Sequence, residues 1–392
     1  MPADTTRHKI LIVVGTRPEV IKMAPLYKEL KNQSNFNVLL CATGQHSALL
    51  ELALNDFDLS ADYNLELMQH GQGLSNLTSR ALIGIEEVLR EVNPDAVLVH
   101  GDTTTTFTAA LAAFYAQIPI GHVEAGLRTR DIYSPFPEEF NRQAVSRIAN
   151  WNFAPTIQAK QNLMFEGVEE DRIIVTGNTV VDSIRLLVEE SNNGKLEKSW
   201  LELIDLLGFD PKLQKTVLVT THRRENFGEG IANIFQAVAV LAKSNNQARF
   251  VLPLHPNPHI RAAASPLQES QNVSVIDPLA YRHFILLLSV SHFVITDSGG
   301  IQEEAVTLNN KVILARQNTE RPEGIDNESI VLAGTSTEQI VRHGNALLAA
   351  PNSSRGLQGL NTAFGDGRAS ARIVNELFSD FAEGQPSRYR RL

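Results

Sequence analysis

Carboxylate and histidine side chains recur at short spacings in the first half of this 392-residue sequence. His100 and Asp102 are two residues apart, and so are His122 and Glu124. If an extended strand continues through each pair, its two side chains point to one face, where they could transfer protons, bind a ligand or hold a metal. A metal would need further ligands, and no tightly spaced His-x-x-x-His pair follows. Three interpretations stay open. Asp102 and Glu124 could act as acid–base or ligand-binding groups, a histidine could be buried and hydrogen-bonded, or the residues could hold a metal. Of these, we do not expect the metal site.

A third carboxylate, Glu138, follows the rigid segment Pro135-Phe136-Pro137. Acidic side chains are favoured at the start of a helix in any case, because they interact well with its positive end. The position of Glu138 is therefore as consistent with a helix-capping acid as with a catalytic one.

The second half of the chain carries features that suit an anion. His222 is followed by Arg223-Arg224 directly after an apolar run, and adjacent arginines at such a place usually have an anionic partner. Ser298-Gly299-Gly300 lies between a strand-like and a helix-like segment, where backbone N–H groups can face an anion, although an ordinary helix cap has the same pattern. Glu304, one turn further on, could accept hydrogen bonds from ribose hydroxyls. These features together predict a nucleotide diphosphate ligand.

The elements that must position these residues form a repeating pattern. Short apolar runs, each followed by a polar cluster, alternate with helix-period segments, as in a parallel α/β sheet, which binds ligands at the carboxyl ends of its strands. The predicted strands are residues 10–14, 38–42, 96–99, 118–120, 217–219 and 293–295, with others near 250, 273 and 312. The predicted helices are residues 20–30, 74–91, 104–115, 138–149, 231–242, 280–289, 301–308 and 369–381.

We expect two Rossmann-like α/β domains, residues 1–180 and 181–368, followed by a helix and tail at 369–392. The first domain would carry the carboxylates and the second the nucleotide, with the last helix packing back on the first. Neither a Gly-x-Gly-x-x-Gly fingerprint nor a Gly-x-x-x-x-Gly-Lys-Ser/Thr phosphate loop is present. We therefore predict no nicotinamide or flavin cofactor.

Composition excludes several classes of function. A net charge of -9 argues against non-specific nucleic-acid binding, which normally needs a basic face. The single cysteine, Cys41, lies in a strand-like run and is expected to be a buried core thiol. No apolar stretch approaches the ~20 residues of a membrane helix, and the first apolar run is too short for a signal peptide. We predict a cytoplasmic protein with no membrane insertion.

Seven longer motifs, in order along nearly the whole chain, resemble those of the bacterial non-hydrolysing UDP-N-acetylglucosamine 2-epimerases. They are GTRPEVIK at 15–22, HGD at 100–102, HVEAGLR at 122–128, PFPEE at 135–139, THRREN at 221–226, DSGGIQEE at 297–304 and TERPE at 319–323. The resemblance implies two Rossmann-like domains facing a cleft (glycosyltransferase-B type) and a homodimer. It also implies reversible epimerisation at C2 of UDP-N-acetylglucosamine to UDP-N-acetylmannosamine, through elimination of UDP to 2-acetamidoglucal and re-addition, with no cofactor.

The resemblance also implies a role for each matching residue. Asp102, Glu124 and Glu138 match the family's acid–base carboxylates, and His222 matches a histidine that contacts the diphosphate. Further matches, to substrate-binding residues, are Arg17, Lys22, Leu279, Phe284, Ser298, Gly299, Gly300, Glu304 and Arg321.

Two regions depart from the family pattern. Some relatives have Gln at the position of Leu279, so a base contact there would use the backbone. One branch of the family binds a second substrate molecule as an activator, which makes Gln45 and His46 candidate allosteric residues. Ala48 stands where that branch has a polar side chain, and 71–73 reads Gly-Gln-Gly near the position of its arginine.

Three alternative functions stay open. A UDP-2,3-diacetamido-glucuronate 2-epimerase performs a sibling reaction, but its uronate substrate would ask for an extra cation. A glycosyltransferase of the same fold would need an acceptor groove, and a nucleotide-sugar sensor would have no use for three carboxylates.

Overall fold

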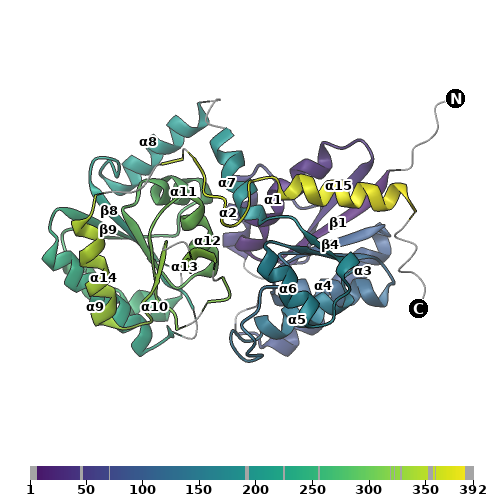
Figure 1. Ribbon diagram of the computed structural model, residues 1–392, viewed down its shortest axis with the longest axis horizontal. Coiled ribbons are helices and arrows are strands. Elements are labelled where there is room, and N and C mark those ends of the chain that lie inside the picture. The colour runs from purple at the N-terminus through teal and green to yellow at the C-terminus, as the bar shows by residue number, and fades with distance from the viewer. Residues whose placement is uncertain are drawn as a thin grey trace. The chain divides into compact units, whose positions relative to one another are not determined.

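The computed structural model describes residues 7–44, 47–69, 71–189, 194–223, 226–254, 257–317, 319–321, 323–326, 329–351, 356–357 and 359–384. The chain divides into two compact units, Met1–Arg185 with Gly365–Leu392, and Leu186–Phe364 (Figure 1). Helix α7 (Thr179–Glu189) runs from the first unit into the second, and the boundary predicted at residue 180 falls inside it. The boundary predicted at residue 368 lies directly before helix α15 (Ala369–Ala382), which belongs to the first unit.

The first unit is built on a seven-stranded, fully parallel sheet in the order β3-β2-β1-β4-β5-β6-β7. Its strands are β1 (His8–Val14), β2 (Phe36–Ala42), β3 (Tyr63–Asn64), β4 (Ala96–His100), β5 (Ile120–Val123), β6 (Trp151–Ala154) and β7 (Ile173–Val175). The helices between them are α1 (Arg17–Lys31), α2 (Ser47–Asp56), α3 (Leu74–Val92), α4 (Thr104–Tyr115), α5 (Glu138–Ile148) and α6 (Ile157–Phe165).

Side-chain alternation along β1 explains why helices cover both faces of this sheet. Ile10 and Ile12 pack into one apolar cluster with α1, α2 and α15, whereas Leu11 and Val13 pack into another with α3, α4 and α5. A strand buried on both faces must be apolar at every position, which is why the run reads as continuous rather than alternating in sequence. Cys41 lies in the second cluster, so the prediction of a buried core thiol is confirmed, and burial raises its pKa to about 12.

Helix α1 contains a proline in its interior, and the rest of the unit compensates for it. Pro25 has no N–H, so the carbonyl of Ile21 one turn earlier cannot receive the usual helical hydrogen bond. The hydroxyl of Ser183, on α7, donates a hydrogen bond of 2.6 Å to this carbonyl instead. This hydrogen bond fixes α7 against α1, the helix that carries the predicted site residues Arg17 and Lys22.

Helix α15 completes the first unit although it comes from the far end of the sequence (Figure 1, yellow). Ile373 and Leu377 are fully buried in the same apolar cluster as β1. The Trp151 indole donates a hydrogen bond to the Asp380 carboxylate, and the backbone N–H of Ser370 at the start of the helix donates to Asp182 at 2.8 Å. Apolar burial and polar contacts thus both hold α15 on this unit.

The second unit is built on a six-stranded, fully parallel sheet in the order β10-β9-β8-β11-β12-β13. Its strands are β8 (Lys215–Thr220), β9 (Ala248–Pro253), β10 (Val273–Ile276), β11 (Phe293–Thr296), β12 (Val312–Leu314) and β13 (Ile330–Leu332). Its helices are α8 (Lys195–Leu207), α9 (Glu229–Ser244), α10 (Pro258–Ala263), α11 (Tyr281–Val290), α12 (Gly299–Thr307), α13 (Glu323–Asp326) and α14 (Thr337–Ala349). Helices α9, α10 and α14 share one apolar cluster with β8, β9 and β11.

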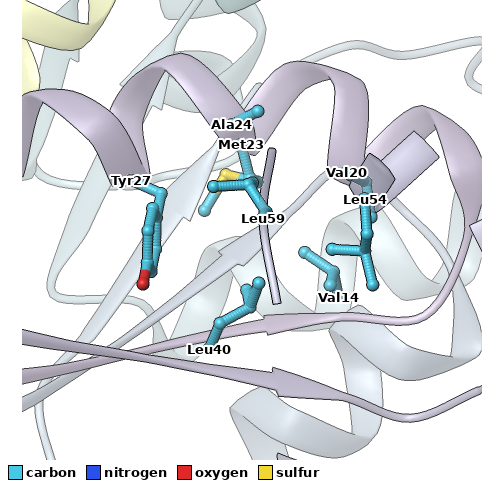
Figure 2. Close-up of a pocket in the computed structure, with 8 residues that line it drawn as sticks. All are labelled: Val14, Val20, Met23, Ala24, Tyr27, Leu40, Leu54 and Leu59. Atoms are coloured by element: carbon cyan, nitrogen blue, oxygen red, sulfur yellow. The ribbon is translucent and has the colours of Figure 1, made fainter. Parts of the chain in front are cut away.

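A small pocket in the first unit lies between α1 and the strands β1 and β2 (Figure 2). Its lining is almost wholly aliphatic, apart from the ring of Tyr27, and most of it belongs to the core cluster of that face. The lining residues are Val14, Val20, Met23, Ala24, Tyr27, Leu40, Leu54 and Leu59. Since a nucleotide needs several charged or hydrogen-bonding partners, this pocket is a packing gap of the core rather than a candidate site.

The predicted element boundaries differ from the observed ones by up to three residues, and the largest differences are at α1 and β5. Helix α1 begins at Arg17, three residues earlier than predicted, because proline is well accommodated in the first turn of a helix and Pro18 lies there. Strand β5 covers Ile120–Val123 rather than 118–120, since Pro119 cannot donate to the ladder. Among the described residues, no helix is both long enough and apolar enough to cross a bilayer.

Candidate active site

The turns after β4 and β5 carry two predicted carboxylates of the first unit, Asp102 and Glu124. Each strand ends before its carboxylate, β4 at His100 and β5 at Val123, so the extended strand on which the i,i+2 argument depended does not continue through either pair. Gly101 and Glu124 instead adopt positive φ angles of 71° and 65°. A Cβ atom on Gly101 would lie 3.5 Å from Oε2 of Glu124, so the turn that leads into Asp102 passes directly beside the Glu124 carboxylate.

Glu124 is held by residues from three other elements. Its side chain is buried, 8% exposed, and its Oε1 accepts hydrogen bonds from the Lys22 ammonium and, at 3.4 Å, from Asn178. Nε2 of His100 lies 3.8 Å from Oε2. A buried carboxylate is costly unless it is paired, and Lys22, itself only 4% exposed, supplies the pairing charge. Two residues predicted separately, Lys22 and Glu124, are therefore one buried ion pair.

Asp102 is oriented by an arginine that sequence reasoning missed. Oδ2 of Asp102 accepts hydrogen bonds from Nε of Arg142 at 2.9 Å and from its Nη2 at 2.6 Å. The backbone carbonyl of Asp102 also accepts a hydrogen bond of 2.8 Å from the Asn141 side chain. Both partners lie on α5, so this helix fixes the carboxylate after β4. The 23% exposure of the Asp102 side chain leaves it accessible to a ligand.

Glu138 is the first residue of α5 and is half-buried. The adjacent Glu139 is fully buried and organises the surrounding loop, because its carboxylate accepts hydrogen bonds from Thr129 N at 3.1 Å and from Arg142 Nη1 at 3.0 Å. Glu139 thus holds the arginine that orients Asp102. The position of Glu138 at the helix start is consistent with both readings of the sequence.

The loop between β1 and α1 is organised by Glu19, which sequence analysis did not single out. Arg17 is the first residue of α1 and is partly exposed. The Glu19 carboxylate, 1% exposed, accepts hydrogen bonds from Gly15 N at 3.0 Å and from the hydroxyls of Thr103 at 2.8 Å and Thr106 at 3.1 Å. Burial raises the pKa of Glu19, whereas these hydrogen bonds lower it. This carboxylate therefore ties the turn before Arg17 to the turn that contains Asp102.

His122 lies inside β5 and is fully buried, which is the hydrogen-bonded histidine anticipated as one reading. Its Nε2 lies 2.7 Å from the carbonyl oxygen of Gly101, and because a carbonyl only accepts, Nε2 carries the proton. Burial lowers the pKa of His122 to about 4. No group of three or more His, Cys, Asp or Glu side chains suited to a metal is found within the described part of the chain.

In the second unit, Asp297 shapes the loop that carries His222. The Asp297 carboxylate is fully buried and accepts hydrogen bonds from Thr221 Oγ1 at 2.7 Å, from the backbone N–H of Arg223 at 3.1 Å and from Asn226 Nδ2 at 3.0 Å. Nδ1 of His222 lies 3.6 Å from Oδ1 of Asp297, and its side chain is 41% exposed. The loop is thus fixed by a carboxylate beneath it while the imidazole faces outward.

Ser298 caps α12, the alternative that the sequence left open, with its hydroxyl accepting from Ile301 N at 3.5 Å. Gly299 and Gly300 form the first turn of the helix, where free N–H groups and the helix dipole favour an anion. Glu304 lies one turn further along α12 and is buried, 6% exposed. The strand–turn–helix context that was predicted for this segment is therefore present.

Gly299 is needed for a close approach by Arg321. A Cβ atom at Gly299 would lie only 2.4 Å from Nη1 of Arg321, so any other residue would displace the guanidinium. Arg321 is buried and donates from Nε to the Glu303 carboxylate and from Nη1 to the Glu320 carboxylate. The arginine predicted as a ligand contact thus lies against the first turn of α12, in a buried ion-pair cluster.

The remaining predicted residues occupy different surroundings. Phe284 is buried on α11, and Leu279 is buried two residues before that helix begins. The candidate allosteric residues Gln45 and His46 lie outside the described residues.

Each unit carries polar side chains at the carboxyl ends of its parallel strands, and the two units together define an enzyme of the glycosyltransferase-B fold class, as the resemblance implied. A family model described as UDP-N-acetylglucosamine 2-epimerase matches residues 28–378. The chain belongs to this family of enzymes.

Individual relatives cover nearly the whole chain. The UDP-N-acetylglucosamine 2-epimerase of Campylobacter jejuni is 43% identical over 373 residues, which are 94% of this chain and 97% of the relative. The crystal structure of the Neisseria meningitidis enzyme bound to UDP-GlcNAc is 42% identical, covers 95% of this chain and 100% of its own, and has a TM-score of 0.89. The Staphylococcus aureus MnaA–UDP structure is 39% identical over 96% of this chain and 97% of its own, with a TM-score of 0.86.

Proposed function

We propose that the protein interconverts UDP-N-acetylglucosamine and UDP-N-acetylmannosamine by eliminating UDP and adding it back. The observation that carries the proposal is the buried Lys22–Glu124 ion pair beside the turn that leads into Asp102. Two carboxylates in one unit, each oriented by a cation, are what proton transfer to and from a sugar carbon requires. The family membership of the chain supports the same reaction.

The chemistry explains why elimination comes before re-addition. The proton on C2 of the sugar has no adjacent carbonyl and is not acidic. Positive charge that develops at C1 as UDP departs makes this proton removable, and the product of the elimination is 2-acetamidoglucal. Return of UDP to C1 with delivery of a proton to the other face of C2 gives the epimer. We propose that Asp102, Glu124 and Glu138 are the acid–base groups of these steps.

The second unit supplies the groups that would stabilise the departing diphosphate. His222 and the N–H groups at Ser298 to Gly300 suit the phosphates, since preorganised donors act most strongly where charge develops. We propose that Glu304 binds the ribose and that the segment with Leu279 and Phe284 binds the uracil. Arg17 and Lys22 of the first unit complete the proposed set, together with Arg321.

We also propose that the protein works as a homodimer, as its resemblance to the family implies. Phe114 and Tyr115 at the end of α4 and Phe140 on α5 are 52%, 68% and 46% exposed, which is apolar surface in the first unit that a second copy could cover. Light scattering after gel filtration measures the mass directly, and a monomer at working concentration would contradict the proposal.

Proton NMR of UDP-N-acetylglucosamine with the protein in D2O, with EDTA present and no added NAD, tests the reaction. Deuterium should enter C2 of both epimers, because the proton removed from C2 exchanges with solvent. Epimerisation without deuterium at C2 would contradict the elimination. Absence of any turnover without an added acceptor would instead favour a glycosyltransferase.

A further inference from the structure

Glu320 lies at the centre of a cluster of three arginines in the second unit. Its Oε2 accepts a hydrogen bond of 2.9 Å from Nη1 of Arg316, and its Oε1 accepts one from Nη1 of Arg321. Nη2 of Arg223 lies 3.9 Å from the same Oε1. A Cβ atom at Gly299 would lie 3.2 Å from this oxygen, so the carboxylate is also in contact with the first turn of α12. One side chain therefore joins the loop after β8, the segment after β12 and the start of α12.

Charged side chains gather beside the first turn of α12. Arg223, Arg316 and Arg321 pair with Glu320, Arg321 also pairs with Glu303, and both carboxylates are buried at 4% and 1% exposure. Buried charges of one sign are costly unless a partner of the other sign compensates them. Guanidinium groups beside a helix N-terminus suit an anionic ligand.

Arg223 differs from the other two arginines of the cluster. Arg316 and Arg321 are 2% and 5% exposed, and each has a direct hydrogen bond to Glu320. The Arg223 side chain is 21% exposed, and its pair with Glu320 is the longest of the three. Its buried Nε has no hydrogen-bond partner among the described residues. Since buried donors are normally satisfied, this guanidinium still has a hydrogen bond to give.

We propose that Arg223 donates hydrogen bonds to the diphosphate of the bound nucleotide sugar and that Glu320 is the residue that positions it. Arg223 follows His222 directly, and Glu320 draws its guanidinium toward the glycine turn of α12. Arg316 and Arg321 in turn donate hydrogen bonds to Glu320. These bonds fix the Glu320 carboxylate beside the glycine turn of α12. The inference rests on the proposed function, because it concerns the same nucleotide.

Equilibrium binding of UDP and of uridine to Arg223→Gln tests the contact without any turnover. The variant should bind UDP about tenfold more weakly or worse, since a charge-assisted hydrogen bond is lost, and should bind uridine like the original protein because uridine has no phosphate. Unchanged UDP affinity, or an equal loss for both ligands, would overturn the contact. Arg342→Gln on α14, an exposed position with the same change of charge, is the control and should leave both affinities unchanged.

A double-mutant cycle tests the positioning role of Glu320. Arg223→Gln should cost about tenfold in UDP affinity in the original background but less than about threefold when Glu320→Gln is present, because an unpositioned arginine has little left to lose. Equal costs in the two backgrounds would overturn the role. Should Glu320→Gln fail to fold, Glu320→Asp keeps the charge on a shorter side chain and takes its place in the cycle.

The proposed reaction can fail independently of this inference. A protein that binds UDP but does not epimerise UDP-N-acetylglucosamine would refute the reaction and leave the binding comparison intact. Normal epimerisation together with unchanged UDP binding by Arg223→Gln would refute the inference alone.

Discussion

Protonation of His122 should destabilise the first unit at mildly acidic pH. The imidazole is fully buried, with Nε2–H donating to the Gly101 carbonyl and Nδ1 without a hydrogen-bond partner in the described part of the chain. A second proton, on Nδ1, would create a buried N–H donor that has no acceptor among the described residues. It would also create a positive charge that water cannot solvate. Burial is the largest cause of the low pKa, and the positive charges of Arg128 and His100 add to it.

The size of the effect follows from the two pKa values. His122 has a pKa of about 4 in the folded protein against 6.5 as a model value, so between these pH values the unfolded chain binds more protons than the folded one. Stability is therefore lost as the pH falls through 6.5 toward 4. Linkage gives a loss of about 2 kcal/mol between pH 8 and pH 5 from this residue, and about 3 kcal/mol by pH 4.

Urea unfolding followed by tryptophan fluorescence measures the loss of stability in the first unit. The chain has two tryptophans, and a Trp200→Phe background leaves Trp151, on β6 of the first unit, as the reporter. His122→Asn removes the titrating group, so its free energy of unfolding should fall by about 2 kcal/mol less than that of the parent between pH 8 and pH 5. Equal losses in the parent and the variant would refute the argument.

Further substitutions test the carboxylates and the proline of α1. Asp102→Asn and Glu124→Gln should each reduce turnover by about 100-fold or more while UDP binding by calorimetry is largely kept, because acid–base groups act in the transition state. Near-normal turnover would remove that residue from the proposed mechanism. Ser183→Ala leaves the Ile21 carbonyl without its donor and should cost about 1–3 kcal/mol in urea unfolding. The cost should shrink in a Pro25→Ala background, whose new N–H can reach that carbonyl, and an equal cost in both would contradict this account.

The parallel architecture could be predicted because each local pattern has one physical reading. Continuous apolar runs such as residues 10–14 suit a strand buried on both faces. Helix-period segments between such runs are typical of a parallel sheet. The polar clusters could be placed for the same reason, since parallel strands put their carboxyl ends along one edge. The largest boundary errors lie beside prolines, at Pro18 in the first turn of α1 and at Pro119 directly before β5.

The partners of the site residues could not be predicted from local patterns. Lys22 and Glu124 are 102 residues apart, and nothing near either one indicates that the two charges meet. Only long-range packing reveals that the more buried of the adjacent acids on α5 is Glu139, which supports a site residue through an arginine. Asp297 is similar, because its sequence neighbours suggested a cap, whereas its carboxylate organises the loop before Arg223.

The placement of α15 determines the order in which the two units can finish folding during synthesis. The first unit contains residues from both ends of the chain, so its core lacks Ile373 and Leu377 until the last segment has left the ribosome. The second unit, Leu186–Phe364, is uninterrupted in sequence and is fully translated before that segment appears. Domains generally fold as they emerge, at about 5–20 residues per second. The half of the protein made first is therefore the half that finishes folding last, and until then the apolar face that Ile373 and Leu377 cover stays exposed.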